Sequence, residues 1–203
     1  LTNEINVTGT LNLLVAARDA AVESFVLAPS SSVYGDDPRM PTKEGQEGKP
    51  LSPYGISKSV GEKYCEVFHG LFGMKAVSLR YFNVFGPRQD PQSQYAAVIP
   101  LFITKVLRGE RPIVFGDGEQ SRDFTYIENV VLANIAAAES GAVGGETLNI
   151  ACGDRLTVNA LLAAVNEVLG TSVRAVHAEP RPGDIRHSVA DVSKSRRVLG
   201  FAP

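Results

Sequence analysis

The sequence has few of the features that mark secreted, membrane-spanning or nucleic-acid-binding chains. Its two cysteines, Cys65 and Cys152, lie far apart and match no metal-ligand or redox spacing, so a reducing cytoplasm is the expected compartment. Twenty basic residues against 22 acidic residues give a formal net charge of -2, which predicts no polycationic surface for nucleic acid. No apolar run approaches the roughly 20 residues that a membrane-spanning helix needs. We therefore expect neither a membrane nor a nucleic acid as partner.

Strong catalytic signatures are missing as well. The three histidines have no mutual spacing suited to a metal ion, and neither His-Glu-x-x-His nor Cys-x-x-Cys occurs. No metal is therefore expected as a cofactor. The sequence also contains no nucleophile elbow, no phosphate-binding P-loop and no Gly-x-Gly-x-x-Gly. The usual loop that holds a dinucleotide pyrophosphate is thus not found among these residues.

What remains is the composition of an ordinary folded protein. The chain has 203 residues, of which 44% are hydrophobic and 21% charged, enough for one domain or one and a half. It begins with Leu1 and enters an amphipathic helical pattern at once, without the layout of a signal peptide. We expect either that an upstream segment was removed or that the chain is a fragment of a longer protein.

Helical and strand-like periodicities alternate along the chain, which favours an α/β fold with a mostly parallel sheet. Turn-forming residues become denser after Phe82, which predicts a smaller second lobe. Pro53 and Gly73 are suited to the first turn and the end of one long helix. The predicted helices span about 2–21, 53–72, 96–108, 128–140, 157–169 and 193–199. The predicted strands span about 25–27, 76–81, 112–115, 146–150 and 173–177.

The segment PYGISK is the first candidate for chemistry. Tyr54 and Lys58 are four residues apart near a predicted helix start, so they share one helix face. A phenol is a poor base at its ordinary pKa near 10, but a neighbouring ammonium stabilises the phenolate and lowers that pKa. Such a pair can take a proton from a substrate hydroxyl. The spacing is also compatible with a solvated lysine beside a packed tyrosine.

Three consecutive serines form the second candidate. Ser30, Ser31 and Ser32 follow an apolar strand, and functional groups gather at the carboxyl ends of strands in parallel sheets. A hydroxyl there can exchange a hydrogen bond with a substrate oxygen. The alternative is a loop whose serines cap backbone groups.

Arginines beside turns form the third candidate. Arg88, Arg122 and Arg181 stand near glycine or proline residues, and Asp184 follows the last of them in RPGD. Guanidinium groups bind phosphate oxygens in pairs, so loops of this kind suit a nucleotide diphosphate. Together with Asn83, they favour a polar ligand site.

Taken in order, these segments resemble the extended short-chain dehydrogenase/reductases, in particular the nucleotide-sugar 4-epimerases. Within that family the resemblance is strongest to bacterial UDP-N-acetylglucosamine 4-epimerases. It runs through nearly the whole chain in family order. The matching segments are NVTGTLNLLVAA (6–17), SSSVYG (30–35), SPYGISK (52–58), LRYFNVFGPRQDP (79–91), YAAVIP (95–100), GDGEQSRDFTYIENV (116–130), LNIACG (148–153) and RPGDIRHSVAD (181–191).

The resemblance implies a Rossmann-like parallel sheet, here without its amino-terminal part, and a smaller lobe that binds the nucleotide sugar. Residues 1–82 would be the carboxyl-terminal part of an NAD-binding domain. Residues 83–203 would be mainly the sugar-nucleotide lobe, interleaved with the sheet. The implied cofactor is NAD, and the implied partners are a UDP-sugar and a second copy of the chain, paired through helices near 2–21 and 54–72.

The resemblance also assigns roles to residues. Tyr54 would be the base and Lys58 its partner, and Ser30 and Ser32 would complete the catalytic set. The residues implied to contact NAD are Ser30, Tyr54, Lys58 and Phe82. The residues implied to bind the UDP-sugar are Ser31, Ser32, Asn83, Ala97, Val98, Ile113, Val114, Phe115, Arg122, Arg181, Asp184 and Ser188. Among these, Ser188 would limit the size of the sugar.

The reaction implied is inversion at C4 of a UDP-hexose through a 4-keto sugar, with UDP-N-acetylglucosamine and UDP-N-acetylgalactosamine as the expected pair. Related dehydratases typically carry Asp-Glu at the positions of Ser31 and Ser32, and related UDP-glucuronate decarboxylases carry Glu at the position of Ser32. Neither carboxylate is present, which favours epimerisation over both. A non-catalytic fragment that binds the nucleotide sugar or forms dimers is the remaining alternative.

Overall fold

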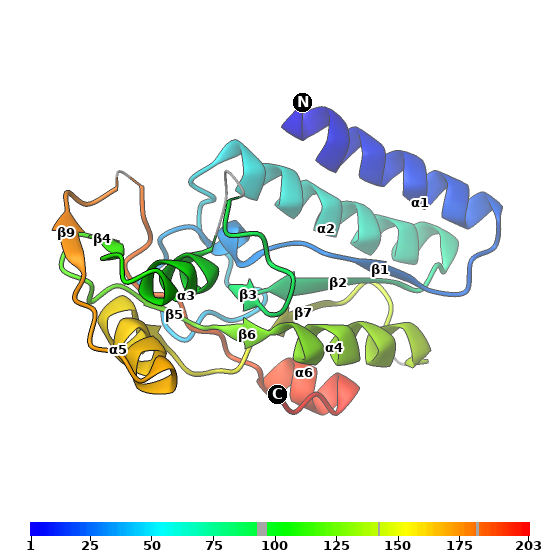
Figure 1. The fold of residues 1–203 in the computed structure, drawn as a ribbon. Helices are drawn as coiled ribbons and strands as arrows, with labels where there is room; N and C mark the ends of the chain where they lie inside the picture. The colour runs from blue at the N-terminus through cyan, green and yellow to red at the C-terminus, as the bar shows by residue number, and fades with distance from the viewer. Residues whose placement is uncertain (93–96, 142, 182) are drawn as a thin grey trace.

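The computed structural model describes residues 1–92, 97–141, 143–181 and 183–203. Figure 1 shows two parts, a parallel sheet between layers of helices and a smaller lobe built around two other helices. The expected α/β class with a parallel sheet is confirmed. Among the described residues, no helix is long and apolar enough to cross a membrane.

The larger part is built on three parallel strands, β1 (Phe25–Leu27), β2 (Ala76–Tyr81) and β7 (Thr147–Ile150), in the order β1-β2-β7. Helix α2 (Pro53–Phe72) lies over one face of this sheet with α1 (Gly9–Asp19) beside it, and helices α4 (Ile127–Glu139) and α6 (Ser193–Leu199) cover the other face (Figure 1). The central strand β2 is therefore buried on both sides.

The alternation of side chains along β2 explains which residues meet which layer. Val77 and Leu79 are fully buried in the cluster that includes Ala133 and Ala137 of α4. Arg80, the residue after Leu79, points to the opposite face and pairs with a carboxylate of α2. One strand thus supplies both the apolar core and a buried charge.

The ends of α2 follow from local sequence. The Ser52 hydroxyl accepts a hydrogen bond from the Gly55 backbone at 3.0 Å, and Pro53 stands in the first turn, where no N–H is needed. Gly73 ends the helix with φ +66°, a conformation that glycine adopts without strain. This helix has the bounds that the sequence predicts.

The smaller lobe contains helices α3 (Val98–Leu107) and α5 (Val158–Leu169), which pack on each other. Strand β4 (Ile113–Phe115) pairs in parallel with β9 (Val176–Ala178), and β5 (Ser121–Arg122) pairs antiparallel with β8 (Leu156–Thr157). Its core is a second apolar cluster made by Phe102, Val106, Val114, Val158, Leu161, Leu162 and Val165.

Residues after Phe82 contribute to both parts. Strands β3 (Val84–Phe85) and β6 (Thr125–Tyr126) pair with each other at the place where the chain passes between the larger part and the smaller lobe. After β6, the elements α4, β7 and α6 belong to the larger part again. A single cut after Phe82 would therefore separate β7 from its neighbour β2. The division into two domains remains a prediction.

Three local differences from the predicted elements have physical reasons. The first helix begins as the π-helical segment η1 (Glu4–Thr8), which periodicity does not reveal. Strand β9 starts at Val176 because the Asn166 side chain hydrogen-bonds both backbone groups of Val173 and keeps that residue in a loop. The strands β3, β5, β6 and β8 have two residues each, too short for a period-two pattern.

Candidate active site

The three serines form a turn beyond the end of β1. Ser30 accepts a hydrogen bond at Oγ from the Ser32 backbone at 3.2 Å, and this starts the 3-10 helix η2 (Ser31–Tyr34). The Ser32 Oγ atom is buried and has no hydrogen-bond partner among the described residues. A buried hydroxyl without a partner is costly, which makes Ser32 a candidate for contact with a bound molecule. We call residues 30–34 the serine turn.

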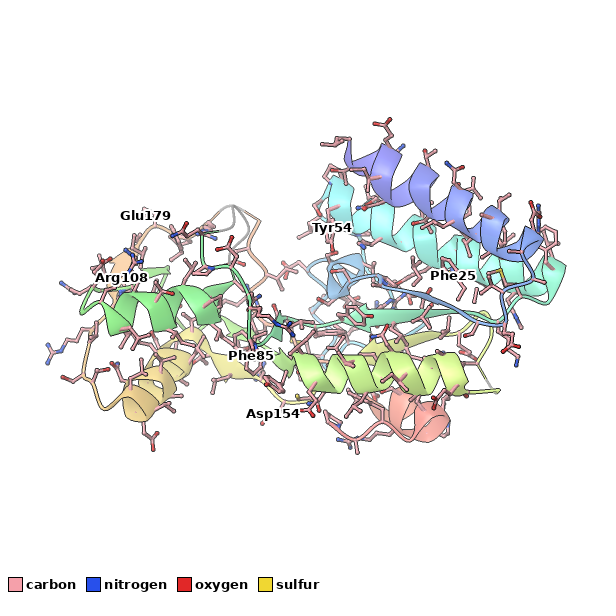
Figure 2. All side chains as sticks on the ribbon, turned by 45° about the vertical axis from the view of Figure 1, so that its right-hand side comes forward. Phe25, Tyr54, Phe85, Arg108, Asp154 and Glu179 are labelled. Carbon is pink, nitrogen blue, oxygen red and sulfur yellow. The ribbon has the colours of Figure 1, made fainter. Side chains whose placement is uncertain are left out.

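Tyr54 and Lys58 lie on α2 beside the serine turn. The Tyr54 ring is 44% exposed, and the Lys58 ammonium lies 5.7 Å from its centroid. The same ammonium donates to the Ala28 carbonyl, just beyond β1, at 2.8 Å. Burial lowers the pKa of Lys58. The expected phenol and ammonium are thus neighbours, and Figure 2 shows Tyr54 at the end of α2 nearer the smaller lobe.

A glycine lets α2 approach the serine turn. A Cβ added at Gly55 would lie 2.8 Å from the Ser32 carbonyl oxygen, closer than side-chain carbons normally come. Gly55 directly follows Tyr54, so this contact places the first turn of α2 against the serine turn. The juxtaposition of Tyr54 and the serines therefore depends on a residue without a side chain.

Two residues that the sequence analysis left without a role support Tyr54, Asn6 from η1 and Ser57 from α2. The Asn6 amide donates to the Ser57 hydroxyl at 3.0 Å, and that hydroxyl donates to the Tyr54 carbonyl at 2.8 Å. Asn6 lies in the π-helical segment Glu4–Thr8. Asn6 belongs to the segment NVTGT, which matches the family in sequence, but only the fold shows that this segment faces α2.

A cavity of about 440 Å³ opens between α3, β4 and the loops around β3 and β5. Among the residues predicted to bind a UDP-sugar, nine line it together: Asn83, Ala97, Val98, Ile113, Val114, Phe115, Arg122, Arg181 and Asp184. Further lining residues that the sequence analysis missed are Phe85, Lys105, Gln120 and Phe124. The scattered segments thus meet around one space.

Two arginines and one carboxylate stand out among the polar groups that line this cavity. The Arg122 Nη2 atom lies 2.6 Å from Asp184 Oδ1, with the Arg122 side chain 17% exposed. The Arg181 guanidinium carbon lies 3.8 Å from the centre of the Phe115 ring. Two guanidinium groups beside an aromatic surface suit a ligand with both a planar ring and an anionic group.

Asn83 is held by the backbone of Asp123, a buried residue that the sequence analysis did not identify. Its amide donates to the Asp123 carbonyl at 3.1 Å. The fully buried Asp123 carboxylate accepts backbone hydrogen bonds from Cys152, Gly153 and Ala190. Burial raises the pKa of Asp123, against the effect of those bonds. Asp123 therefore ties three loops together beside the cavity.

Some predicted residues lie elsewhere. Phe82 is 1% exposed, and its ring packs on the Tyr34 ring with the two centroids 6.1 Å apart. Ser188 is half-buried, donates its backbone N–H to the Ser121 carbonyl at 3.0 Å and does not line the cavity. The exposed Arg88 is also outside the lining. Within YAAVIP, Tyr95 and Ala96 fall outside the described residues. The roles of Phe82, Ser31 and Ser188 remain predictions.

No group of three or more His, Cys, Asp or Glu side chains in the described part of the chain could hold a metal ion. The site offers instead a phenol, an ammonium, hydroxyls and guanidinium groups. These can move a proton and bind an anion.

Comparison with known proteins gives consistent matches. Residues 1–151 match the model of the NAD dependent epimerase/dehydratase family. A putative UDP-glucose 4-epimerase of Methanocaldococcus jannaschii is 39% identical over 201 residues, which cover 98% of this chain and 64% of that protein. The chain therefore spans less than two thirds of the length of that relative.

Two solved structures are similar over nearly the whole chain. The UDP-N-acetylglucosamine 4-epimerase of Methanobrevibacter ruminantium, in complex with UDP-N-acetylmuramic acid, matches with a TM-score of 0.95 and 43% identity, covering 99% of this chain and 64% of that one. The UDP-glucose 4-epimerase of Thermus thermophilus, in complex with NAD, matches with a TM-score of 0.88 and 36% identity, covering 98% and 65%.

Proposed function

The chain belongs to the NAD-dependent epimerase/dehydratase family, and on that premise we propose that it forms the catalytic and sugar-nucleotide-binding part of a UDP-hexose 4-epimerase. The proposed substrate pair is UDP-N-acetylglucosamine and UDP-N-acetylgalactosamine. The observation that carries the proposal is the cavity with its two arginines, together with Tyr54, Lys58 and a Ser32 hydroxyl that has no partner among the described residues.

The cavity supports a UDP group in chemical terms. Val98, Val114 and Phe115 offer an apolar wall for the uracil ring, while Arg122 and Arg181 offer charge-assisted donors for the diphosphate. In the free protein, Arg122 is paired with Asp184. On binding, the diphosphate would take the place of this carboxylate, and Asp184 would then be available to a ribose hydroxyl.

The chemistry follows from the substrate. The hydrogen on C4 of a sugar is not acidic, so C4 inverts only after oxidation to a ketone. Tyr54 would take the proton of the 4-hydroxyl, with the Lys58 ammonium 5.7 Å from the centre of its ring. The Ser32 hydroxyl would donate to the 4-oxygen and orient it. The diphosphate would stay anchored while the sugar turns, and Tyr54 would then return the proton.

Ser30, Tyr54 and Lys58 fit the nicotinamide ribose end of NAD, because they provide hydroxyl and ammonium donors beside the Ser32 oxygen, which has no partner in the part of the chain that the structure describes. NAD, when bound, supplies the acceptor and donor of the C4 hydride. The 203 residues contain no Gly-x-Gly-x-x-Gly for the pyrophosphate. That absence supports a second candidate function, in which the chain binds the sugar nucleotide but does not catalyse its conversion by itself.

The test is proton NMR of the anomeric region after the chain is incubated with NAD and either UDP-N-acetylglucosamine or UDP-glucose. We expect the galacto epimer to appear, and we expect Tyr54→Phe to lower its rate by at least about a hundredfold while UDP affinity stays unchanged. Conversion of UDP-glucose alone would overturn the proposed N-acetylated pair. UDP binding without conversion of either sugar would favour the non-catalytic function.

We also propose that the chain pairs with a second copy through α1 and α2. Leu13, Val67 and Leu71 on these helices are 63%, 48% and 72% exposed, and the small exposed residues Ala16 and Ala20 would allow α1 to approach a partner helix closely. Sedimentation equilibrium is expected to show a dimer that Leu71→Glu dissociates. A monomer at every concentration would contradict the pairing.

A further inference from the structure

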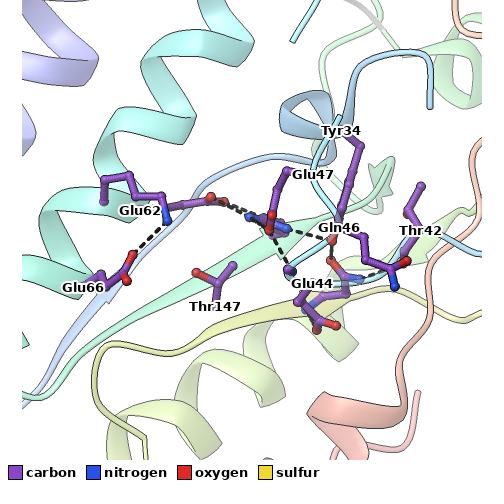
Figure 3. Close-up of polar contacts among 12 residues, drawn as sticks. Tyr34, Thr42, Glu44, Gln46, Glu47, Glu62, Glu66 and Thr147 are labelled. Atoms are coloured by element: carbon purple, nitrogen blue, oxygen red, sulfur yellow. Dashed lines mark hydrogen bonds and ion pairs between the residues drawn. The ribbon is translucent and has the colours of Figure 1, made fainter. Parts of the chain in front are cut away.

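A buried guanidinium lies between the two halves of the proposed catalytic site. Arg80 of β2 is 2% exposed, and its Nε and Nη2 atoms donate to the two carboxylate oxygens of Glu62 on α2 at 2.6 and 2.7 Å. Its Nη1 donates to the Tyr34 hydroxyl at 2.8 Å, and Glu47 Oε1 lies 2.7 Å from Nη2. Figure 3 shows Tyr34, Glu47 and Glu62 converging on this one side chain.

The contacts continue from Tyr34 into the sheet. The Tyr34 hydroxyl donates to Asn149 Oδ1 at 2.7 Å on β7, and the Asn149 amide donates to the carbonyls of Thr42 and Asp191 at 3.1 Å each. The Tyr34 ring also lies under the Arg80 guanidinium, 4.8 Å from its carbon. The Tyr34 hydroxyl therefore both accepts and donates a hydrogen bond, and the end of the serine turn is fixed to β2 and β7.

Stability alone is a weak reason for this arrangement. A buried ion pair must repay the desolvation of both charges, and it commonly adds little to stability compared with well-packed apolar side chains. Glu62 and Arg80 are 5% and 2% exposed, so that cost is high. The planar fork of arginine, in contrast, fixes direction as well as distance. The geometry therefore favours a role in orientation.

The placement of Glu62 shows what is oriented. Tyr54, Lys58 and Glu62 stand four residues apart in turn, so they share one face of α2. Lys58 is held by the Ala28 carbonyl and Glu62 by Arg80, which attaches this face to the residue just beyond β1 and to β2. The other side of Arg80 holds Tyr34, two residues after Ser32.

We infer that Arg80 is a positioning residue, which sets the rotation of α2 against the serine turn so that Tyr54 and Ser32 face the same substrate hydroxyl. This inference rests on the proposed function for its catalytic consequence. The geometric part, the coupling of α2 to the serine turn through Arg80, is independent of any reaction.

Arg80→Lys tests the inference because it keeps the charge and removes the fork. In backbone amide NMR spectra of the chain, we expect shifts both at residues 30–35 and at residues 54–58, neither of which includes Glu47 or Glu62. In the epimerase assay, we expect kcat to fall about tenfold while KM stays within about twofold, since misplacement by a fraction of an ångström slows chemistry more than binding. Affinity for UDP should stay unchanged.

Phe201→Leu is the matched control. Phe201 is buried on the opposite face of the sheet, in the cluster with Val77 and Leu79. Its substitution by leucine should therefore lower stability without changing a contact of Arg80. The inference would be overturned if the amide shifts caused by Arg80→Lys were confined to residues 47 and 62 and its kcat were no lower than that of Phe201→Leu. If the parent chain binds UDP but converts no sugar, the proposed function fails, and the amide shifts alone decide the role of Arg80.

Tyr34→Phe keeps the inference testable if Arg80→Lys does not fold. It removes one hydroxyl from the network and leaves the ring packed on Phe82. We expect smaller amide shifts in the same two segments. Shifts at residues 30–35 alone would show that the serine turn and α2 are not coupled through Arg80.

Discussion

Arg122 and Asp184 form an ion pair in the wall of the cavity, although they stand on separate segments that meet only in the fold. The pair keeps a cationic side chain in place before any ligand arrives. It also means that an anionic ligand competes with a carboxylate that is already present. Binding of UDP should therefore depend on Arg122 more than on arginines that lie outside the cavity.

Arg122→Met is expected to weaken UDP binding by about ten- to a hundredfold, the loss of one or two charge-assisted hydrogen bonds. Isothermal titration calorimetry with UDP measures it. Arg186→Met is the matched control, because Arg186 makes a comparable pair with Asp117 at 2.7 Å but does not line the cavity. Equal losses for the two variants would show that general charge, rather than this site, governs binding.

The Ser32 hydroxyl gives a prediction in which stability and activity diverge. Ser32→Ala should leave stability unchanged or raise it by up to about 1 kcal/mol, because it removes a buried oxygen that has no partner in the described part of the chain. Turnover should fall about tenfold or more, if the hydroxyl orients the substrate. Urea unfolding and the NMR assay measure the two effects.

Ser30→Ala is the comparison within the same turn. The Ser30 hydroxyl accepts the Ser32 backbone N–H, so its loss should cost about 1 kcal/mol of stability. A Ser32→Ala variant that is as destabilised as Ser30→Ala would argue that the Ser32 oxygen has a structural partner.

Gly55 should respond to substitution in two opposite ways. Within a helix, alanine is generally more favourable than glycine by up to about 1 kcal/mol. The added Cβ of Gly55→Ala, however, would lie 2.8 Å from the Ser32 carbonyl, a backbone atom that moves only with the serine turn. We expect little net gain in stability and a loss of turnover of about tenfold or more.

Gly70→Ala, in the same helix, has nothing within 4 Å of its added Cβ. It should raise the free energy of unfolding by about 1 kcal/mol and leave turnover unchanged. If Gly55→Ala behaves like Gly70→Ala in both measurements, then the close approach of α2 to the serine turn is unimportant for the reaction.

Local features of the fold could be predicted because they depend on residues that are neighbours in the sequence. Ser52, Pro53 and Gly73 mark both ends of α2, and the structure has that helix at 53–72. The cavity residues were found only because their segments resemble those of a known family. Periodicity says nothing about whether Asn83 and Arg181 meet, since that depends on the pairing of distant segments.

The Arg80 network could not be predicted for a related reason. Arg80 stands in an apolar strand, where an arginine suggests an edge or an exposed end, and its partners Tyr34 and Glu62 come from a turn and a helix. Only the parallel order β1-β2-β7, with α2 above it, brings them together. Asp123 shows the same limit, because its three backbone partners come from two distant loops.

Tyr34 should make the protein sensitive to high pH. Burial raises the pKa of Tyr34 to about 12, although Arg80 and Asn149 partly oppose the rise. The unfolded chain ionises this phenol near pH 10, so between about pH 10 and 12 unfolding releases a proton that the folded state keeps. The stability that Tyr34 contributes is therefore complete below pH 10 and is lost as the pH rises towards 12.

The measurement is the free energy of unfolding in urea, for the parent and for Tyr34→Phe, at several values from pH 8 to pH 11.5. At pH 8 we expect the variant to be less stable by about 1 to 3 kcal/mol, because Arg80 and Asn149 each lose a buried partner. Above pH 10 the difference should shrink by about 1.4 kcal/mol per pH unit. Other groups that titrate in this range, such as Cys65 with its pKa raised to about 11 by burial, are common to both proteins and cancel. A difference that stays constant across the range would mean that the Tyr34 phenol ionises alike in the folded and unfolded chain.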